Sequence, residues 1–293
     1  MPKTSQRATE LALAAAAVLL IGALAGLPAA SVPAEETDPI ERGNAAFEGR
    51  FEIETILDAI AAYEAALATL GSQPIETQAF VLNRLAQLYY ERTTFTAGNT
   101  GEDRDAFEIG RAYGLRSLRL NEEFAALEED DFDAAVAAAT DPVALLWTAD
   151  NWGGLLNTDP ILGMLQLGRV RTLYERSLAI DETCWGASAH NALGAMLVVT
   201  PTLLGGDEEA GLQHLEQAVE IAPTYLLNRV VRAQYWGFSY DLFGAIDGVR
   251  DAAFIEAELS FVLGAPIGDW PLWNREAKRE AEALLAELEE RTP

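Results

Sequence analysis

Residues 190–197, HNALGAML, and residues 211–223, GLQHLEQAVEIAP, carry the pattern that decides the fold. In both stretches, apolar and small residues recur three or four positions apart, which is the spacing of one face of an α-helix. Small residues let paired helices approach, and large residues fill the gap between them. The positions are Leu193, Gly194 and Leu197 in the first stretch, and Gly211, Leu215, Ala218 and Pro223 in the second. The sequence therefore predicts two packed helices here.

This arrangement of small and large residues is typical of the tetratricopeptide repeat, a helix–turn–helix unit. An insertion of about five residues, around VVTPTLLGGD at 198–207, separates the two halves. Weaker copies of the pattern occur at 59–66, 82–89 and 170–177. We therefore predict an all-α fold, a tetratricopeptide-like right-handed superhelix of helical hairpins with degenerate repeats.

Helical periodicity continues along most of the chain, and strand patterns are scarce. Between the predicted helices lie breaks rich in Gly, Pro, Asn and Asp, which interrupt helices. The stretch LEEDDFDAAV, 127–136, is predicted as an acidic loop or helix start, and it lacks the glycine and spaced ligands of a calcium-binding loop. The predicted helices span 39–48, 52–70, 75–93, 103–120, 141–157, 160–180, 184–199, 207–221, 225–246, 250–263 and 272–290.

The first 34 residues have the pattern of a secretory signal peptide. Lys3 and Arg7 precede an uncharged apolar run at 11–26, and small residues follow it. The run is slightly short for a membrane span, which favours cleavage over an uncleaved membrane anchor. We therefore expect residues 1–34 to be a signal peptide and 35–293 to be a single helical domain. Because no cysteine lies near the cleavage zone, we expect an exported, periplasmic protein without a lipid anchor.

The composition narrows the classes of function. The chain has 20 basic and 46 acidic residues, a net charge of −26, and such a surface repels nucleic acid. Cys184 is the single cysteine, which rules out an intramolecular disulfide and a multi-cysteine metal site. The sequence contains none of the common phosphate-loop, zinc-protease or nucleophile-elbow motifs. We expect no catalytic residues, no metal and no cofactor, and therefore not an enzyme.

Three stretches together resemble the T component of tripartite ATP-independent periplasmic (TRAP) transporters. They are ALLWTADNWGGLLN at 144–157, the repeat region at 186–221, and YLLNRVVRAQYW at 225–236. The resemblance implies an exported, helical, tetratricopeptide-like protein that associates with the solute-binding component feeding a membrane permease. It also implies a homotrimer with a central pore and ligand-sized hydrophobic tunnels. Family members are commonly lipoproteins, and this sequence departs from them in lacking an acylatable cysteine.

The stretch 144–157 combines apolar residues with residues that disfavour a helix interior. Trp147, Asn151 and Gly154 fall on one helix face, whereas Trp152 points roughly 140° away from Trp147. The two tryptophans are therefore predicted to make different contacts, and Trp147, Asn151 and Trp152 are candidate ligand-binding residues. The alternative is architectural: the glycines permit close helix packing, and Asn151 bonds between repeats.

The remaining candidate ligand-binding residues lie at the repeat and beyond it: His190, Arg229, Arg232, Tyr235 and Trp236. His190 is either a core histidine or a hydrogen-bonding partner for a ligand. Arg229 and Arg232, one turn apart, could bind a carboxylate ligand or pair with the many acidic residues. Gly205, Gly206 and Asp207 are predicted to form a structural turn and an N-cap.

Two functions remain open from the sequence. The first is an accessory protein of a TRAP transport system that associates with the solute-binding component and binds or relays a small hydrophobic or organic-acid ligand. The second is a general tetratricopeptide scaffold for interactions between periplasmic or envelope proteins.

Overall fold

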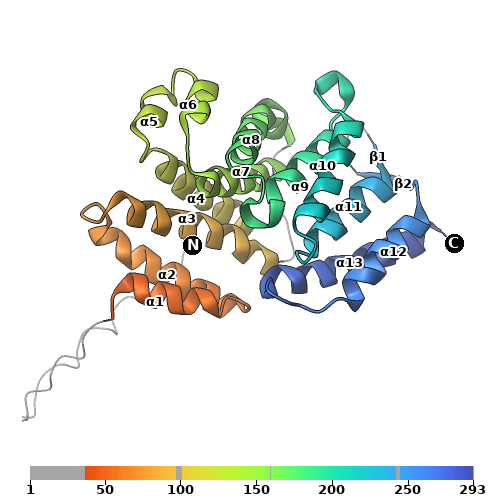
Figure 1. The fold of residues 1–293 in the computed structure, drawn as a ribbon, viewed down its shortest axis with the longest axis horizontal. Coiled ribbons are helices and arrows are strands. Elements are labelled where there is room, and N and C mark those ends of the chain that lie inside the picture. Colours follow the sequence, from red (N-terminus) through yellow and green to blue (C-terminus); the bar gives the residue numbers. More distant parts are fainter. Residues whose placement is uncertain (1–36, 97–100, 159, 242–244, 293) are drawn as a thin grey trace, which may run out of the picture. The chain divides into compact units, whose positions relative to one another are not determined.

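The structure, a computed structural model, describes residues 37–96, 101–158, 160–241 and 245–292. Thirteen α-helices account for most of these residues, which confirms the all-α class (Figure 1). Among the described residues, no helix is both long and apolar enough to span a membrane. The predicted signal peptide lies outside the described residues, and the right-handed superhelix stays a prediction.

Ten of the eleven predicted helices are observed with both ends within two residues of the prediction, and the exception is described below. The observed helices are α1 (Pro39–Glu48), α2 (Ile53–Leu70), α3 (Ile75–Glu91), α4 (Gly101–Leu118), α5 (Glu122–Leu127), α6 (Phe132–Ala138), α7 (Pro142–Asn157), α8 (Pro160–Ile180), α9 (Cys184–Val199), α10 (Glu208–Ile221), α11 (Leu227–Gly237), α12 (Ala252–Gly264) and α13 (Pro271–Arg291). Two short 3-10 helices, η1 (Arg92–Phe95) and η2 (Thr202–Leu204), lie between them. Helices α5 and α6 were not predicted as separate helices.

The prediction of one helix over 225–246 is wrong. Helix α11 ends at Gly237, and an antiparallel hairpin of β1 (Phe238–Tyr240) and β2 (Ile246–Val249) follows. A Cβ atom at Gly237 would lie 2.1 Å from Ile255 of α12, so α12 can pack this closely on the end of α11 only because Gly237 has no side chain. Aromatic and β-branched residues then favour strands over a continued helix.

The acidic stretch 127–136 contains a helix boundary rather than one loop. Helix α6 begins after Asp131, whose side chain accepts a hydrogen bond from the Ala134 amide. Helix α5 begins after Asn121, which caps it in the same way. Phe124 and Phe132 from these two helices meet edge to face in the core. The buried aromatic residues thus give an acidic segment enough apolar surface to fold.

Most helices pack against their neighbours in sequence, as α1 does on α2, α7 on α8, and α9 on α10 (Figure 1). Helix α7 also packs on α3 and α4, which precede it by more than two helices. Buried residues of α3, α7 and α13 meet in one apolar cluster with Tyr225. Helix α7 therefore contacts both N-terminal and C-terminal elements, and α3 also contacts α13 directly through Tyr90 and Trp273.

The contact between α4 and α7 depends on glycines. A Cβ atom at Gly154 of α7 would lie 2.5 Å from the ring of Phe107 of α4. A Cβ atom at Gly110 of α4 would lie 2.0 Å from the amide oxygen of Asn151. Larger residues at these positions would force the two helices apart. Gly153, by contrast, has its nearest neighbours at 3.8 Å, an ordinary van der Waals contact.

The adjacent glycines of α7 give a matched test of this packing. Gly154→Ala should destabilise the protein by about 1–3 kcal/mol, because the new methyl group overlaps the Phe107 ring. Gly153→Ala should stabilise it by roughly 0.5–1 kcal/mol, because alanine favours the helix and the methyl group has room. The free energy of unfolding, measured in urea for both variants, checks this. Effects of equal sign would contradict the proposed contact.

Candidate functional site

Helix α7 presents its two tryptophans to different parts of the molecule. The Trp147 ring lies 5.8 Å from Tyr90 and 5.2 Å from Trp185, measured between centroids. The Trp152 ring meets Phe132 edge to face at 5.7 Å, and its indole nitrogen donates to Gln166 over 2.7 Å. The two rings belong to separate apolar clusters. The prediction that they make different contacts is confirmed.

Asn151 lies between helices. Its amide nitrogen donates to the carbonyl oxygen of Ala86 in α3 over 2.9 Å and to that of Trp147 over 2.8 Å. The side chain is fully buried, and its amide oxygen has no hydrogen-bond partner. Trp147, Asn151 and Gly154 thus share the face that contacts α3 and α4, as predicted from their spacing. A ligand-binding role for Asn151 stays a prediction.

Around Trp147 lies a connected set of rings that we name the aromatic cluster. Its links are short: 5.7 Å between the centroids of Trp185 and Trp270, and 4.7 Å between those of Tyr225 and Trp270. Tyr90 connects Trp147 to Phe107 and Trp273, which come from α4 and α13. The members are Tyr90, Phe107, Trp147, Trp185, Tyr225, Trp270 and Trp273.

Two indole nitrogens in the aromatic cluster are buried and have no hydrogen-bond partner within the described ranges of the chain. They are the donors of Trp147 and Trp185. Buried indole N–H groups usually find an acceptor, so an unpaired pair in one cluster is unusual. Sequence reasoning missed Trp185, Trp270 and Tyr90 as neighbours of Trp147. Only the number of tryptophans pointed toward such a cluster, because its members come from segments far apart in sequence.

Trp185 is held by an unusual backbone. Trp185, Gly186 and Ala187 all have left-handed backbone angles, with φ of 47°, 66° and 61°. A left-handed conformation costs an L-residue about 1–2 kcal/mol. A Cβ atom at Gly186 would lie 2.9 Å from the Tyr225 ring, so glycine is needed here for space as well as for its angles. Strain of this kind persists where the surrounding contacts hold it, and here they orient the Trp185 ring.

Two carboxyl groups influence the aromatic cluster. Tyr174 donates a hydrogen bond to Asp150 over 2.6 Å, and burial raises the pKa of Asp150 to about 7. On α13, burial and the neighbouring Glu276 raise the pKa of Glu280 to about 7. The pKa of Tyr90 is raised by burial and then by both carboxyl groups, Asp150 and Glu280, which places both near its ring. When ionised, the two carboxyl groups therefore disfavour a further negative charge close to the Tyr90 ring.

His190 pairs with the other histidine of the chain. Its Nδ1 atom lies 2.8 Å from Nδ1 of His214, so that one ring donates and the other accepts. His190 is buried, and its second ring nitrogen has no partner. Burial and the neighbouring His214 lower the pKa of His190 to about 4. The pair joins α9 to α10 as two neutral rings.

The two candidate arginines of α11 share one acidic partner. Arg229 and Arg232 contact Glu258 of α12 at 3.1 Å and 2.8 Å. Their guanidinium groups also lie over aromatic rings of α12, those of Phe261 and Phe254. Of the two roles predicted for these arginines, the arrangement matches pairing with acidic residues of the chain and not binding of a carboxylate ligand.

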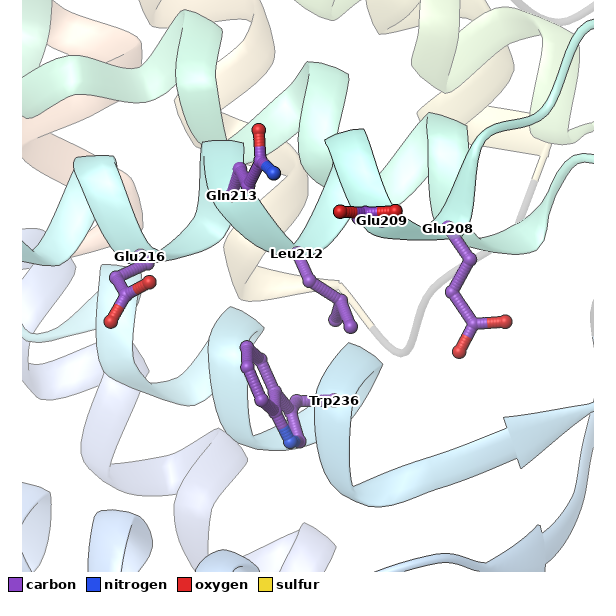
Figure 2. A pocket seen from close by; sticks show the side chains of 6 residues that line it. All are labelled: Glu208, Glu209, Leu212, Gln213, Glu216 and Trp236. Carbon is purple, nitrogen blue, oxygen red and sulfur yellow. The ribbon is translucent and has the colours of Figure 1, made fainter.

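Tyr235 and Trp236 point to different neighbours. The Tyr235 ring stacks on Tyr240 with centroids 5.3 Å apart, and its pKa is raised by burial and then by Glu280. The Trp236 ring lies 5.6 Å from Phe254. Trp236 also lines a surface pocket with residues of α10 (Figure 2). Of the predicted residues, only Trp147 is itself a member of the aromatic cluster.

The segment before α10 makes a tight turn. Gly205 has a φ of 93°, and a Cβ atom at Gly206 would lie 1.6 Å from the Thr200 carbonyl oxygen. The Asp207 side chain accepts a hydrogen bond from the Ala210 amide at the start of α10. These contacts connect the end of α9 to α10 without a longer loop.

The described part of the chain contains no group of three His, Cys, Asp or Glu side chains placed to hold a metal ion. Cys184 is buried, and burial raises the pKa of its thiol to about 12. A thiol with so high a pKa is a weak nucleophile at neutral pH.

The histidine pair makes stability depend on pH. The pKa of His190 is lower in the folded chain than in the unfolded one, so its contribution is present above about pH 6.5 and is lost as the pH falls toward 4. Between pH 7 and pH 4, the unfolding free energy should therefore fall more for the unmodified protein than for His190→Gln, by on the order of 2 kcal/mol. The raised pKa values of Asp150 and Glu280 change the unfolding free energy with pH in the opposite direction. Both proteins contain these residues, so the comparison cancels their contribution. If the difference in unfolding free energy between the unmodified protein and His190→Gln stays the same from pH 7 to pH 4, this account is contradicted.

The sequence matches the family TAtT, the TRAP transporter T-component, over residues 77–291. A search of curated proteins gives no match. The matched range covers well over half of the chain and includes every member of the aromatic cluster. The resemblance inferred from three short stretches is thereby confirmed, and the chain belongs to the TRAP transporter T-component family.

Proposed function

We propose that this protein is an exported accessory component that associates with the solute-binding protein of its TRAP transport system and binds a small ligand. Membership of the T-component family supports a role in transport over that of a general scaffold. It also supports a non-enzymatic function. The acidic composition supports a partner other than nucleic acid.

One observation carries the ligand proposal: two unpaired indole donors lie inside a cluster of seven aromatic side chains. Apolar walls with a few polar groups are typical of small-molecule sites. Trp185, Trp270 and Tyr90 are each half-buried, so the edge of the cluster is partly exposed to solvent. An apolar ligand with a hydrogen-bond acceptor would pack on these rings and pair an indole N–H group.

Of the two ligand classes suggested by the sequence, we favour the hydrophobic one over the organic acid. Arg229 and Arg232, the residues that could have bound a carboxylate, already pair with Glu258. The carboxyl groups near Tyr90 belong to Asp150 and Glu280, and they repel an anion when ionised. An uncharged ligand meets neither obstacle.

The neutral fluorescent probe N-phenyl-1-naphthylamine tests the ligand site. We expect the purified protein to bind it, and Trp270→Ala to weaken binding at least about tenfold through lost ring contact. Trp270 precedes α13 and is half-buried, so the variant should fold. Trp236→Ala, outside the aromatic cluster, is the matched control and should bind like the unmodified protein. Equal loss in both variants, or no binding at all, would refute the site.

Co-purification tests the association. The full chain should retain the solute-binding protein of its own transport system on a column in dilute salt. An unrelated solute-binding protein of similar charge serves as the control and should pass through. Failure to retain the matching protein at micromolar concentrations would contradict the proposed role.

A further inference from the structure

The outer face of α10 and Trp236 of α11 enclose an open surface pocket of about 380 Å³ (Figure 2). Its volume lies in the range of sites that bind small molecules or single side chains. Leu212 and Trp236 form the apolar part of the pocket, and Figure 2 shows their side chains pointing toward each other across it. The remaining lining residues are Glu208, Glu209, Gln213 and Glu216.

The rim of this pocket carries excess negative charge. Glu208 pairs with Arg250 of the following hairpin. Glu209 and Glu216 make no ion pair with any residue in the described ranges, and no basic side chain lines the pocket. Both carboxylates are exposed. The pocket therefore offers two uncompensated carboxylates beside an apolar floor.

Trp236 is positioned to receive a cation. Phe254 covers the ring on one side, with 5.6 Å between the centroids, and so fixes its orientation. A cation over a tryptophan face gains about 0.5–1 kcal/mol at exposed sites. The aliphatic stem of lysine or arginine packs on apolar surface while its charged head reaches acidic groups. Leu212, Trp236 and the two glutamates match these two parts of a basic side chain.

We infer that this pocket binds a lysine or arginine side chain of a partner protein, which is the solute-binding protein if the proposed function holds. Charge complementarity selects a basic partner, because an anion would meet the glutamates and an apolar group would desolvate them. The segment leading into α10 argues for a protein rather than a free amine: Leu203 and Leu204 are 95% and 64% exposed there. A protein surface can cover these leucines while its basic side chain occupies the pocket, whereas a small amine cannot.

Binding of the full chain to the solute-binding protein of its own system, measured by biolayer interferometry, tests the inference. We expect Glu209→Lys with Glu216→Lys to weaken binding at least tenfold, and Trp236→Ala to weaken it several-fold. The matched control is Glu282→Lys with Glu289→Lys, which changes the net charge equally on exposed positions of α13 and should bind like the unmodified chain. Raising the salt concentration should weaken binding between the unmodified chain and the solute-binding protein. It should also reduce the difference in affinity between the unmodified chain and the variants.

The outcomes separate this inference from the proposed function. Binding that the α10 variants leave unchanged overturns the pocket and leaves the association intact. Equal loss in the α10 and α13 variants reduces the effect to net charge and also overturns the pocket. No binding by the unmodified chain overturns both. Binding of free ethylguanidinium that the α10 variants abolish, with partner binding unchanged in those variants, would make the pocket a small-cation site and overturn the inference.

Discussion

The close approach of α7 to α3 and α4 is the contact on which the other features depend. It requires that Gly154 and Gly110 have no side chains, because Phe107 and Asn151 occupy that space. At this distance the Asn151 amide reaches the Ala86 carbonyl oxygen and connects α7 to α3. The same face then directs Trp147 toward Tyr90, and with it the whole aromatic cluster. An asparagine and two glycines that look misplaced in a core helix are therefore the residues that position the site.

The aromatic cluster combines ordered packing with unmet hydrogen-bonding capacity. The rings of Trp147 and Trp185 meet edge to face, which is a favourable geometry, while their N–H groups remain unpaired. Asp150 satisfies its burial differently, through Tyr174 and a raised pKa. The cluster thus has an apolar interior with carboxyl groups at its side, in keeping with the acidic character of the whole chain.

Local sequence patterns predicted most of the helices, though not α5 and α6, and the division of α7 into two faces, because both follow from helical geometry within one segment. They did not predict the neighbours of Trp147. Trp185 reaches it through a left-handed backbone, and Trp270 and Trp273 come from the other end of the chain. They also missed the end of α11 at Gly237, where the decisive neighbour is Ile255 of the next helix. Contacts between distant segments decided both cases, and a single sequence contains no record of them.

The left-handed turn at 185–187 has a consequence for how this part of the chain can vary in length. The turn lies at the start of α9, directly after the linker from α8, and it places the Trp185 ring between Trp147 and Trp270. One inserted or deleted residue at 181–187 would rotate or shift this ring away from both partners, even if every neighbouring side chain were kept. The linker between α8 and α9 can therefore tolerate substitutions at its exposed positions, such as Glu182, far better than a change in its number of residues.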